Sequence, residues 1–220
     1  MLYLYCDIFL NNCRFKFAAE RRIIMPQVFS LKEKEELRQR MLAIGFELLK
    51  QYGMTHTSVE KVTKAVGLGR STFYNFFPTK EKFIYEIICY QREKAMAKFN
   101  QILDGREKMT TAEAKEYLRY LYSGEDTIYP YLTTTDEAKL QAALPDDFVV
   151  DVELEIHTID SFLIHMEGVK DSLDYPVIAN LMKTFALVQE AKEMLHKEAL
   201  GRTLDAMFEL LFSLIFYPED

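Results

Sequence analysis

The sequence predicts an all-α protein. Apolar residues recur at intervals of three and four along most of the chain, which is the spacing that places them on one face of a helix. No stretch shows a sustained period-two alternation bounded by hairpin turns, so strands are not predicted. Glycines and prolines divide the helical pattern into segments joined by mostly short loops. We therefore expect a three-helix N-terminal domain that a long helix joins to a C-terminal helical domain.

The first predicted helix begins at a capping-box pair, Ser30 and Glu33, which are three residues apart. It runs for about 22 residues and stops at Gly53. Gly45 lies within it and should cost up to about 1 kcal/mol of helix stability unless close packing requires a glycine there. The apolar face carries Leu37, Met41, Ile44 and Leu48.

The second predicted helix starts after Thr57 and Ser58, whose hydroxyl groups suit a helix N-cap. It ends at Gly67. Leu68 stands between Gly67 and Gly69, and a glycine can adopt a tight or left-handed conformation without steric cost. The chain can therefore reverse sharply here, with Leu68 filling the angle between two helices.

A short third helix from Arg70 to Phe77 has two different faces. Aromatic side chains should pack inward, whereas polar ones should face outward. Pro78 ends this helix, and Thr79 caps a long helix from Lys80 to about Leu103. The inward set is Phe73, Phe76 and Phe77, and the outward set is Arg70, Ser71, Tyr74 and Asn75. Further helices are expected near 111–122, 135–143, 147–166, 176–196 and 198–217.

The charge is unevenly distributed along the chain. The net charge is −7 in total, divided as +2 over residues 1–29, +4 over residues 30–82 and −13 over residues 83–220. A strongly acidic total argues against nucleic-acid binding only when the acidic residues lie on the binding region. Here residues 30–82, which include the glycine turn, carry a net positive charge, so this region can bind an anionic partner.

The three cysteines, Cys6, Cys13 and Cys89, are at no metal-ligand spacing and indicate a reducing cytoplasm. No apolar run reaches the roughly 18 to 20 residues that span a bilayer, and no membrane partner is expected. The apolar start is interrupted by Asp7 and lacks the basic residues of a signal peptide. Residues 1–29 precede the first predicted helix as an N-terminal extension. An alternative is that the natural protein starts at Met25 and that residues 1–24 are misassigned.

Two helices joined by a tight glycine turn have the geometry of a helix-turn-helix, whose second helix enters the major groove of DNA. Arg70 can pair with phosphate or guanine, and Asn75 can pair with adenine. Hydroxyl groups can bind base edges or phosphates, and a lysine in the first turn of a helix suits a phosphate. The residues predicted to bind double-stranded DNA are Thr57, Arg70, Ser71, Thr72, Tyr74, Asn75 and Lys80.

This segment resembles the DNA-binding domain of the TetR family of bacterial transcriptional regulators. Matching positions extend over about 25 residues, and residues 30–82 resemble the family strongly. Gly45 stands where the family usually has alanine. Ser71 and Asn75 also differ from the residues that are common in the family, and because both would face the DNA, they bear on which operator is read. The matched residues are Thr57, Ser58, Val59, Val62, Gly67, Leu68, Arg70, Thr72, Phe73, Tyr74, Phe77, Thr79, Lys80 and Glu81.

The resemblance implies that residues 83–220 form an effector-binding and dimerisation domain. A homodimer would form through a four-helix bundle of the last two helices, at Leu181, Phe185, Leu204, Met207, Leu211 and Leu214. The alternative is that these residues belong to an intramolecular core. A small-molecule effector would enter an apolar, aromatic cavity. Its candidate contacts are Cys89, Met96, Tyr117, Tyr120, His157, Phe162 and Phe185.

No cofactor, metal or catalytic arrangement is predicted, and the chain is not expected to be an enzyme. Glu153, His157 and Asp160 have a spacing that could ligate a metal, but such a face is more often solvated. The leading hypothesis is a ligand-responsive repressor that binds a palindromic operator as a homodimer. Two alternatives stay open: a DNA-binding regulator controlled by a protein partner or by no effector, and an enzyme or carrier that uses the C-terminal helices.

Overall fold

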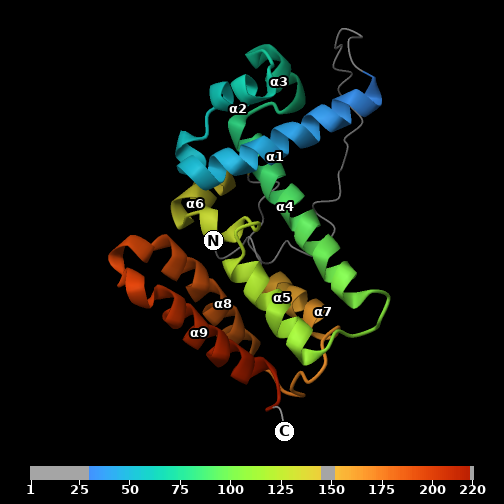
Figure 1. Cartoon of the computed structure of the whole chain (residues 1–220), viewed down its shortest axis with the longest axis vertical. Coiled ribbons are helices and arrows are strands. Elements are labelled where there is room, and N and C mark those ends of the chain that lie inside the picture. Colours follow the sequence, from blue (N-terminus) through green and yellow to red (C-terminus); the bar gives the residue numbers. More distant parts are fainter. Residues whose placement is uncertain (1–29, 145–151, 219–220) are drawn as a thin grey trace. The chain divides into compact units, whose positions relative to one another are not determined.

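The computed structural model describes residues 30–144 and 152–218 and shows a helical protein (Figure 1). The all-α prediction is confirmed: within the described ranges, extended pairing is limited to two isolated bridges, Met109 with Met166 and Val169 with Phe216. The N-terminal extension, with Cys6, Cys13 and Met25, lies outside these ranges. The side chain of Glu153 is likewise not described, so the metal alternative stays a prediction.

The described helices follow the predicted order closely. Three 3-10 turns were not predicted; they are η3 (Tyr129–Tyr131), η4 (Lys192–Met194) and η5 (Lys197–Ala199). The α-helices are α1 (Leu31–His56), α2 (Val59–Val66), α3 (Arg70–Phe76), α4 (Lys80–Leu103), α5 (Thr111–Ser123), α6 (Thr134–Ala143), α7 (Val152–Leu163), α8 (Tyr175–Glu190) and α9 (Leu200–Ile215).

Helix α1 begins and bends where its sequence indicates. Ser30 accepts a hydrogen bond from the Glu33 amide, and the Glu33 carboxylate accepts one from the Ser30 amide at 2.7 Å, so the capping box is complete. Gly53 has φ 71°, a left-handed conformation that favours glycine, and the last helical residues follow this kink. The helix was predicted to stop at Gly53, and the observed break lies there.

The chain divides into two compact units, and the division falls inside α4. The N-terminal unit, as described, contains residues 30–91 and 135–144, so it includes α6 as well as α1 to α3. The C-terminal unit contains residues 92–134 and 152–218. The predicted boundary at residue 82 divides the chain by function, whereas these units are defined by packing.

The core of the N-terminal unit is an aromatic cluster around the start of α4. The Phe83 ring lies 5.0 Å from Phe73 and 4.8 Å from Phe77, between ring centroids. All three side chains are essentially fully buried. Helix α1 approaches this cluster closely at Gly45, because a Cβ atom there would lie 2.4 Å from Phe83 and 2.6 Å from Ile87. Close packing therefore explains the glycine in the middle of α1.

Helices α8 and α9 lie side by side in the C-terminal unit (Figure 1). Phe185 of α8 and Phe208 of α9 pack with ring centroids 4.4 Å apart. Arg119 of α5 pairs with Asp205 at 3.0 Å and with Glu209 at 2.7 Å, and so holds α9 against α5. None of the described helices is long and apolar enough to cross a membrane.

Candidate nucleic-acid interface

The turn between α2 and α3 has the geometry that its glycines predict. Ser58 caps α2 by accepting a hydrogen bond from the Lys61 amide. Gly67 is left-handed, with φ 74° and ψ 35°, and ends α2 with its N–H donating to the Thr63 carbonyl. Leu68 is half-buried and donates its own N–H to the same carbonyl at 2.9 Å. Helix α3 therefore starts after a sharp reversal in which two successive amides donate to the Thr63 carbonyl.

Helix α3 separates a buried aromatic face from an exposed polar face. Phe73 and Phe77 are 0% exposed, and Phe76 is half-buried. Tyr74 is 39% exposed, and the other polar residues of the face are exposed except for Thr72, which is half-buried. Two aromatic anchors thus fix the rotation of a helix of only seven residues. The exposed residues are Arg70, Ser71, Tyr74 and Asn75.

Arg70 is held in place by two neighbours. Its guanidinium lies 2.7 Å from the Glu60 carboxylate of α2 and donates a long hydrogen bond, 3.4 Å, to the Tyr74 hydroxyl. The hydrogen bond to Tyr74 and the charge of Glu60 raise the pKa of Arg70 above its ordinary value. Glu60 was not among the predicted site residues, because a glutamate in the first turn of a helix is common for helix-dipole reasons alone.

Lys80 lies at the start of α4 and points back toward α1. Its Nζ donates to the Thr55 carbonyl at 3.0 Å, and Lys139 of α6 donates to the Thr55 hydroxyl at 3.3 Å. Burial lowers the pKa of Lys80, and the charge of Lys139 adds to that effect, while Glu81 and Asp136 oppose it. Thr79 caps α4 as predicted, since its hydroxyl accepts the Lys82 amide at 3.0 Å.

Thr57 has a local structural role. It is 1% exposed, and its hydroxyl donates to the Gly53 carbonyl at 2.8 Å, across the kink in α1. Its neighbour Ser58, which is half-buried, is the residue that caps α2. Because the Thr57 hydroxyl is buried and already bonded, we leave Thr57 out of the proposed DNA-contacting set.

The candidate effector residues fall into separate places. Phe99 packs against Tyr117 at 5.2 Å and against Phe162 at 5.0 Å, and the Tyr117 ring is 6.2 Å from Tyr120. Phe185 belongs to the other aromatic cluster, with Tyr122 and Phe208. His157 is exposed, Cys89 and Met96 are half-buried, and Cys89 lies in the N-terminal unit. The described ring contacts thus place these residues in more than one cluster, and the effector site stays a prediction.

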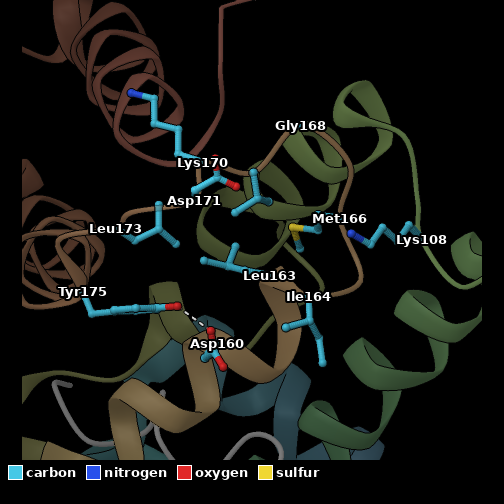
Figure 2. Close-up of a pocket in the computed structure, with 11 residues that line it drawn as sticks. Lys108, Asp160, Leu163, Ile164, Met166, Gly168, Lys170, Asp171, Leu173 and Tyr175 are labelled. Atoms are coloured by element: carbon cyan, nitrogen blue, oxygen red, sulfur yellow. Dashed lines mark hydrogen bonds between the residues drawn. The ribbon is translucent and has the colours of Figure 1, made fainter.

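A cavity of about 320 Å³ lies in the C-terminal unit, at the end of α7 (Figure 2). Leu163, Met166 and Leu173 supply apolar walls, and Tyr175 donates a hydrogen bond to the Asp160 carboxylate. Burial, with this hydrogen bond, raises the pKa of Tyr175 to about 12. A second cavity of about 420 Å³ includes Tyr117 in its lining. Of the predicted effector residues, Tyr117 alone lines one of these two cavities.

The predicted dimer residues differ in exposure. Phe185 and Leu211 are buried in the chain's own core, at 1% and 0% exposed, so for these two the intramolecular alternative describes the packing. The others are half-buried. Further apolar side chains on α8 and α9 are exposed, at 44% for Val177, 45% for Leu187 and 52% for Leu210. The half-buried residues are Leu181, Leu204, Met207 and Leu214.

Comparison with known proteins places this helix-turn-helix among bacterial regulators. Residues 42–87 match a family model described as bacterial regulatory proteins, tetR family. The chain is 29% identical over 92 residues to YuxN of Bacillus subtilis (strain 168), an uncharacterized HTH-type transcriptional regulator, over 42% of this chain and 30% of that protein. It is 29% identical over 73 residues to the HTH-type transcriptional regulator UidR of Escherichia coli (strain K12), over 33% of this chain and 37% of UidR. The matched region thus spans about a third of the length of these curated relatives.

Two solved structures share the fold over most of their length. One is from work on the control of antibiotic production by bacterial hormones; it has a TM-score of 0.53 and 17% identity and covers 86% of this chain and 100% of that chain. The other is a putative tetR family transcription regulator from Shewanella sp. PV-4, with a TM-score of 0.51 and 13% identity, covering 83% of this chain and 99% of that one. At these identities the likeness extends to the fold alone.

Proposed function

Because the chain belongs to the TetR family of bacterial regulatory proteins, we propose that it represses transcription by binding a palindromic operator as a homodimer and releases it when an effector binds. The observation that carries the proposal is the exposed polar face of α3, which two fully buried phenylalanines hold outward. Relatives in this family are transcription regulators and not enzymes, so the enzyme or carrier alternative is set aside.

The proposed DNA contacts combine base reading with phosphate binding. In the major groove, Arg70 pairs with guanine and Asn75 with adenine, while the hydroxyl groups of Ser71 and Thr72 bind base edges or backbone. Tyr74 and Lys80 bind phosphates on either side of the helix. The Glu60 carboxylate that holds Arg70 limits the orientations of its guanidinium, which supports reading of one base position. A protein that binds DNA in this way would act in the cytoplasm.

The homodimer and the effector response rest on the C-terminal unit. Exposed apolar residues on α8 and α9 supply a surface for a four-helix bundle across a twofold axis. The aromatic cluster of Phe99, Tyr117 and Phe162 supplies apolar walls for a small molecule. Successive half-sites lie about 34 to 36 Å apart along the DNA. An effector that binds more tightly to a dimer state in which the two α3 helices no longer match this spacing would release the operator.

Tyr74→Ala and Lys80→Ala test the assignment of the DNA-binding face. Each variant removes a phosphate contact from both subunits, so we expect operator affinity to fall about tenfold or more while the dimer stays intact. A gel shift measures affinity on a duplex recovered by selection with the purified protein, and sedimentation checks the dimer. Lys192→Ala, at an exposed position in the C-terminal unit, is the matched control. If both variants keep wild-type affinity and salt dependence, this face does not bind DNA.

A further inference from the structure

Three lysines from three helices gather at the C-terminal end of α1. Lys61 of α2 donates to the His56 carbonyl at 2.9 Å, and Lys80 of α4 donates to the Thr55 carbonyl at 3.0 Å. Lys139 of α6 donates to the Thr55 hydroxyl at 3.3 Å. Figure 1 shows α6 beside this end of α1. We call Lys61, Lys80 and Lys139 the lysine cluster.

Two members of the lysine cluster have a structural explanation. The last carbonyls of a helix lack partners within the helix and carry a partial negative charge, so cations bind there favourably. Lys61 and Lys80 satisfy two such carbonyls. Lys139 does not satisfy a backbone carbonyl. It donates to the Thr55 side-chain hydroxyl, and the Thr55 carbonyl already accepts a hydrogen bond from Lys80. Capping of α1 therefore does not account for Lys139.

Among the residues that the structure describes, the ammonium groups of the lysine cluster have carboxylates nearby but none in direct contact. Across the described ranges, no ion pair joins any of its three ammonium groups to a carboxylate. Asp136 and Glu81 are near enough to favour the charged form of Lys80, yet burial and Lys139 lower its pKa overall. Lys139 itself is exposed. An anion between the two lysines would relieve both their mutual repulsion and the cost of burying Lys80.

We propose that Lys139 extends the DNA-binding surface onto α6 and binds a backbone phosphate of the duplex beside the phosphate held by Lys80. The inference rests on the proposed function. Duplex DNA is the favoured partner because Lys80, which is itself a proposed phosphate contact, belongs to the lysine cluster and shares Thr55 with Lys139. Since both ammonium groups contact Thr55, a strand that reaches Lys80 also comes within reach of Lys139. The contact is independent of base sequence and adds affinity rather than specificity.

The test is the salt dependence of DNA binding by full-length Lys139→Gln. Each phosphate contact contributes about 0.9 to the slope of log affinity against log salt, so a dimer that loses two contacts should lose about 1.8. The ratio of wild-type affinity to Lys139→Gln affinity should then fall about tenfold between 50 and 200 mM salt. Selected operator and scrambled duplex should weaken by the same factor. Lys139→Arg should restore the slope, and Lys192→Gln should leave it unchanged.

The possible outcomes separate this inference from the proposed function. Wild-type protein that binds the operator, with a Lys139→Gln variant of equal slope and affinity, would overturn the role of Lys139 and leave the proposed function standing. A variant with a lower melting temperature but an unchanged slope would assign Lys139 a structural role only and would also overturn it. Wild-type protein that binds no duplex at any salt concentration would remove both proposals.

Discussion

Thr57 and Ser58 are adjacent hydroxyl residues with different roles. Both suit a helix N-cap, and the sequence could not decide between them because the choice depends on where the chain turns after α1. The kink at Gly53 brings its carbonyl to Thr57, which is buried, and leaves Ser58 to cap α2. At α3, the four-residue spacing of Phe73 and Phe77 was sufficient to predict the buried face. Single polar residues are thus harder to assign than periodic apolar ones.

Glu113 offers a residue-scale test through acid stability. A hydrogen bond from Arg106, with another from the Thr110 amide, lowers its pKa to about 2. The ionised form therefore stabilises the folded state fully above the ordinary value of 4.5, and this contribution is lost as pH falls from 4.5 toward 2. We expect wild type to unfold at a higher temperature than Glu113→Gln at pH 6 and at pH 4, with the difference closing at lower pH.

Thermal melts of both proteins from pH 6 down to about pH 2 measure this difference. All other carboxylates titrate in both proteins, so the comparison isolates Glu113. A difference in melting temperature that stays constant over the whole range would contradict the role of its charge in capping α5.

At the scale of elements, Gly45 sets how closely α1 approaches α4. An alanine there would force Phe83 to move, which costs about 1 to 3 kcal/mol as overpacking, against a gain of up to about 1 kcal/mol in helix propensity. We expect Gly45→Ala to lower the free energy of unfolding by about 1 to 2 kcal/mol. Operator affinity should also fall, because Phe83 packs on both anchors of α3.

Gly201→Ala in α9 is the matched control for Gly45→Ala. A Cβ atom at Gly201 meets nothing within 4 Å, so the substitution should be neutral or stabilising by up to about 1 kcal/mol. Urea denaturation measures both variants. A Gly45→Ala protein as stable as wild type would mean that the Phe83 ring has room to rotate away.

The ends of the later helices show where local pattern stops being informative. The helix predicted over 176–196 ends at Glu190 and is followed by the turns η4 and η5. Met194 is 88% exposed and Leu195 is 39% exposed, so these apolar residues have little packing to hold a helix in place. A helix at the surface is stabilised mainly where another element covers its apolar face, and these residues lack such cover.

At the scale of the whole molecule, the proposed homodimer can be tested on α9. Leu210 is 52% exposed, and in a four-helix bundle its side chain would be buried against the partner subunit. Because burial of an unpaired charge is costly, Leu210→Glu should weaken self-association by at least about tenfold. Sedimentation measures the change, while helical content by circular dichroism should remain that of wild type.

Ile164→Glu is the control for the dimer prediction. Ile164 is similarly exposed, at 54%, but lies just after α7 and belongs to neither α8 nor α9. It should keep the wild-type state of association. If Leu210→Glu also keeps it, the exposed face of α9 is not the dimer surface.

The fold class could be predicted from the sequence because helical periodicity is local. The membership of α6 in the N-terminal unit could not be predicted. Lys139 and Thr55 are 84 residues apart, and an amphipathic pattern shows which side of a helix is buried without showing what covers it. The same reason explains why the seven effector candidates, chosen for aromatic and polar character, are distributed over different clusters.

The discontinuous N-terminal unit also has a consequence for folding. Residues 92–134 must loop out before α6 can dock, and closing a loop of about 40 residues costs about 3 kcal/mol of chain entropy. Leu140 of α6 is fully buried, so docking offsets part of that cost. A gene fragment that ends with the helix-turn-helix would therefore encode an incomplete domain, with apolar surface left open to water.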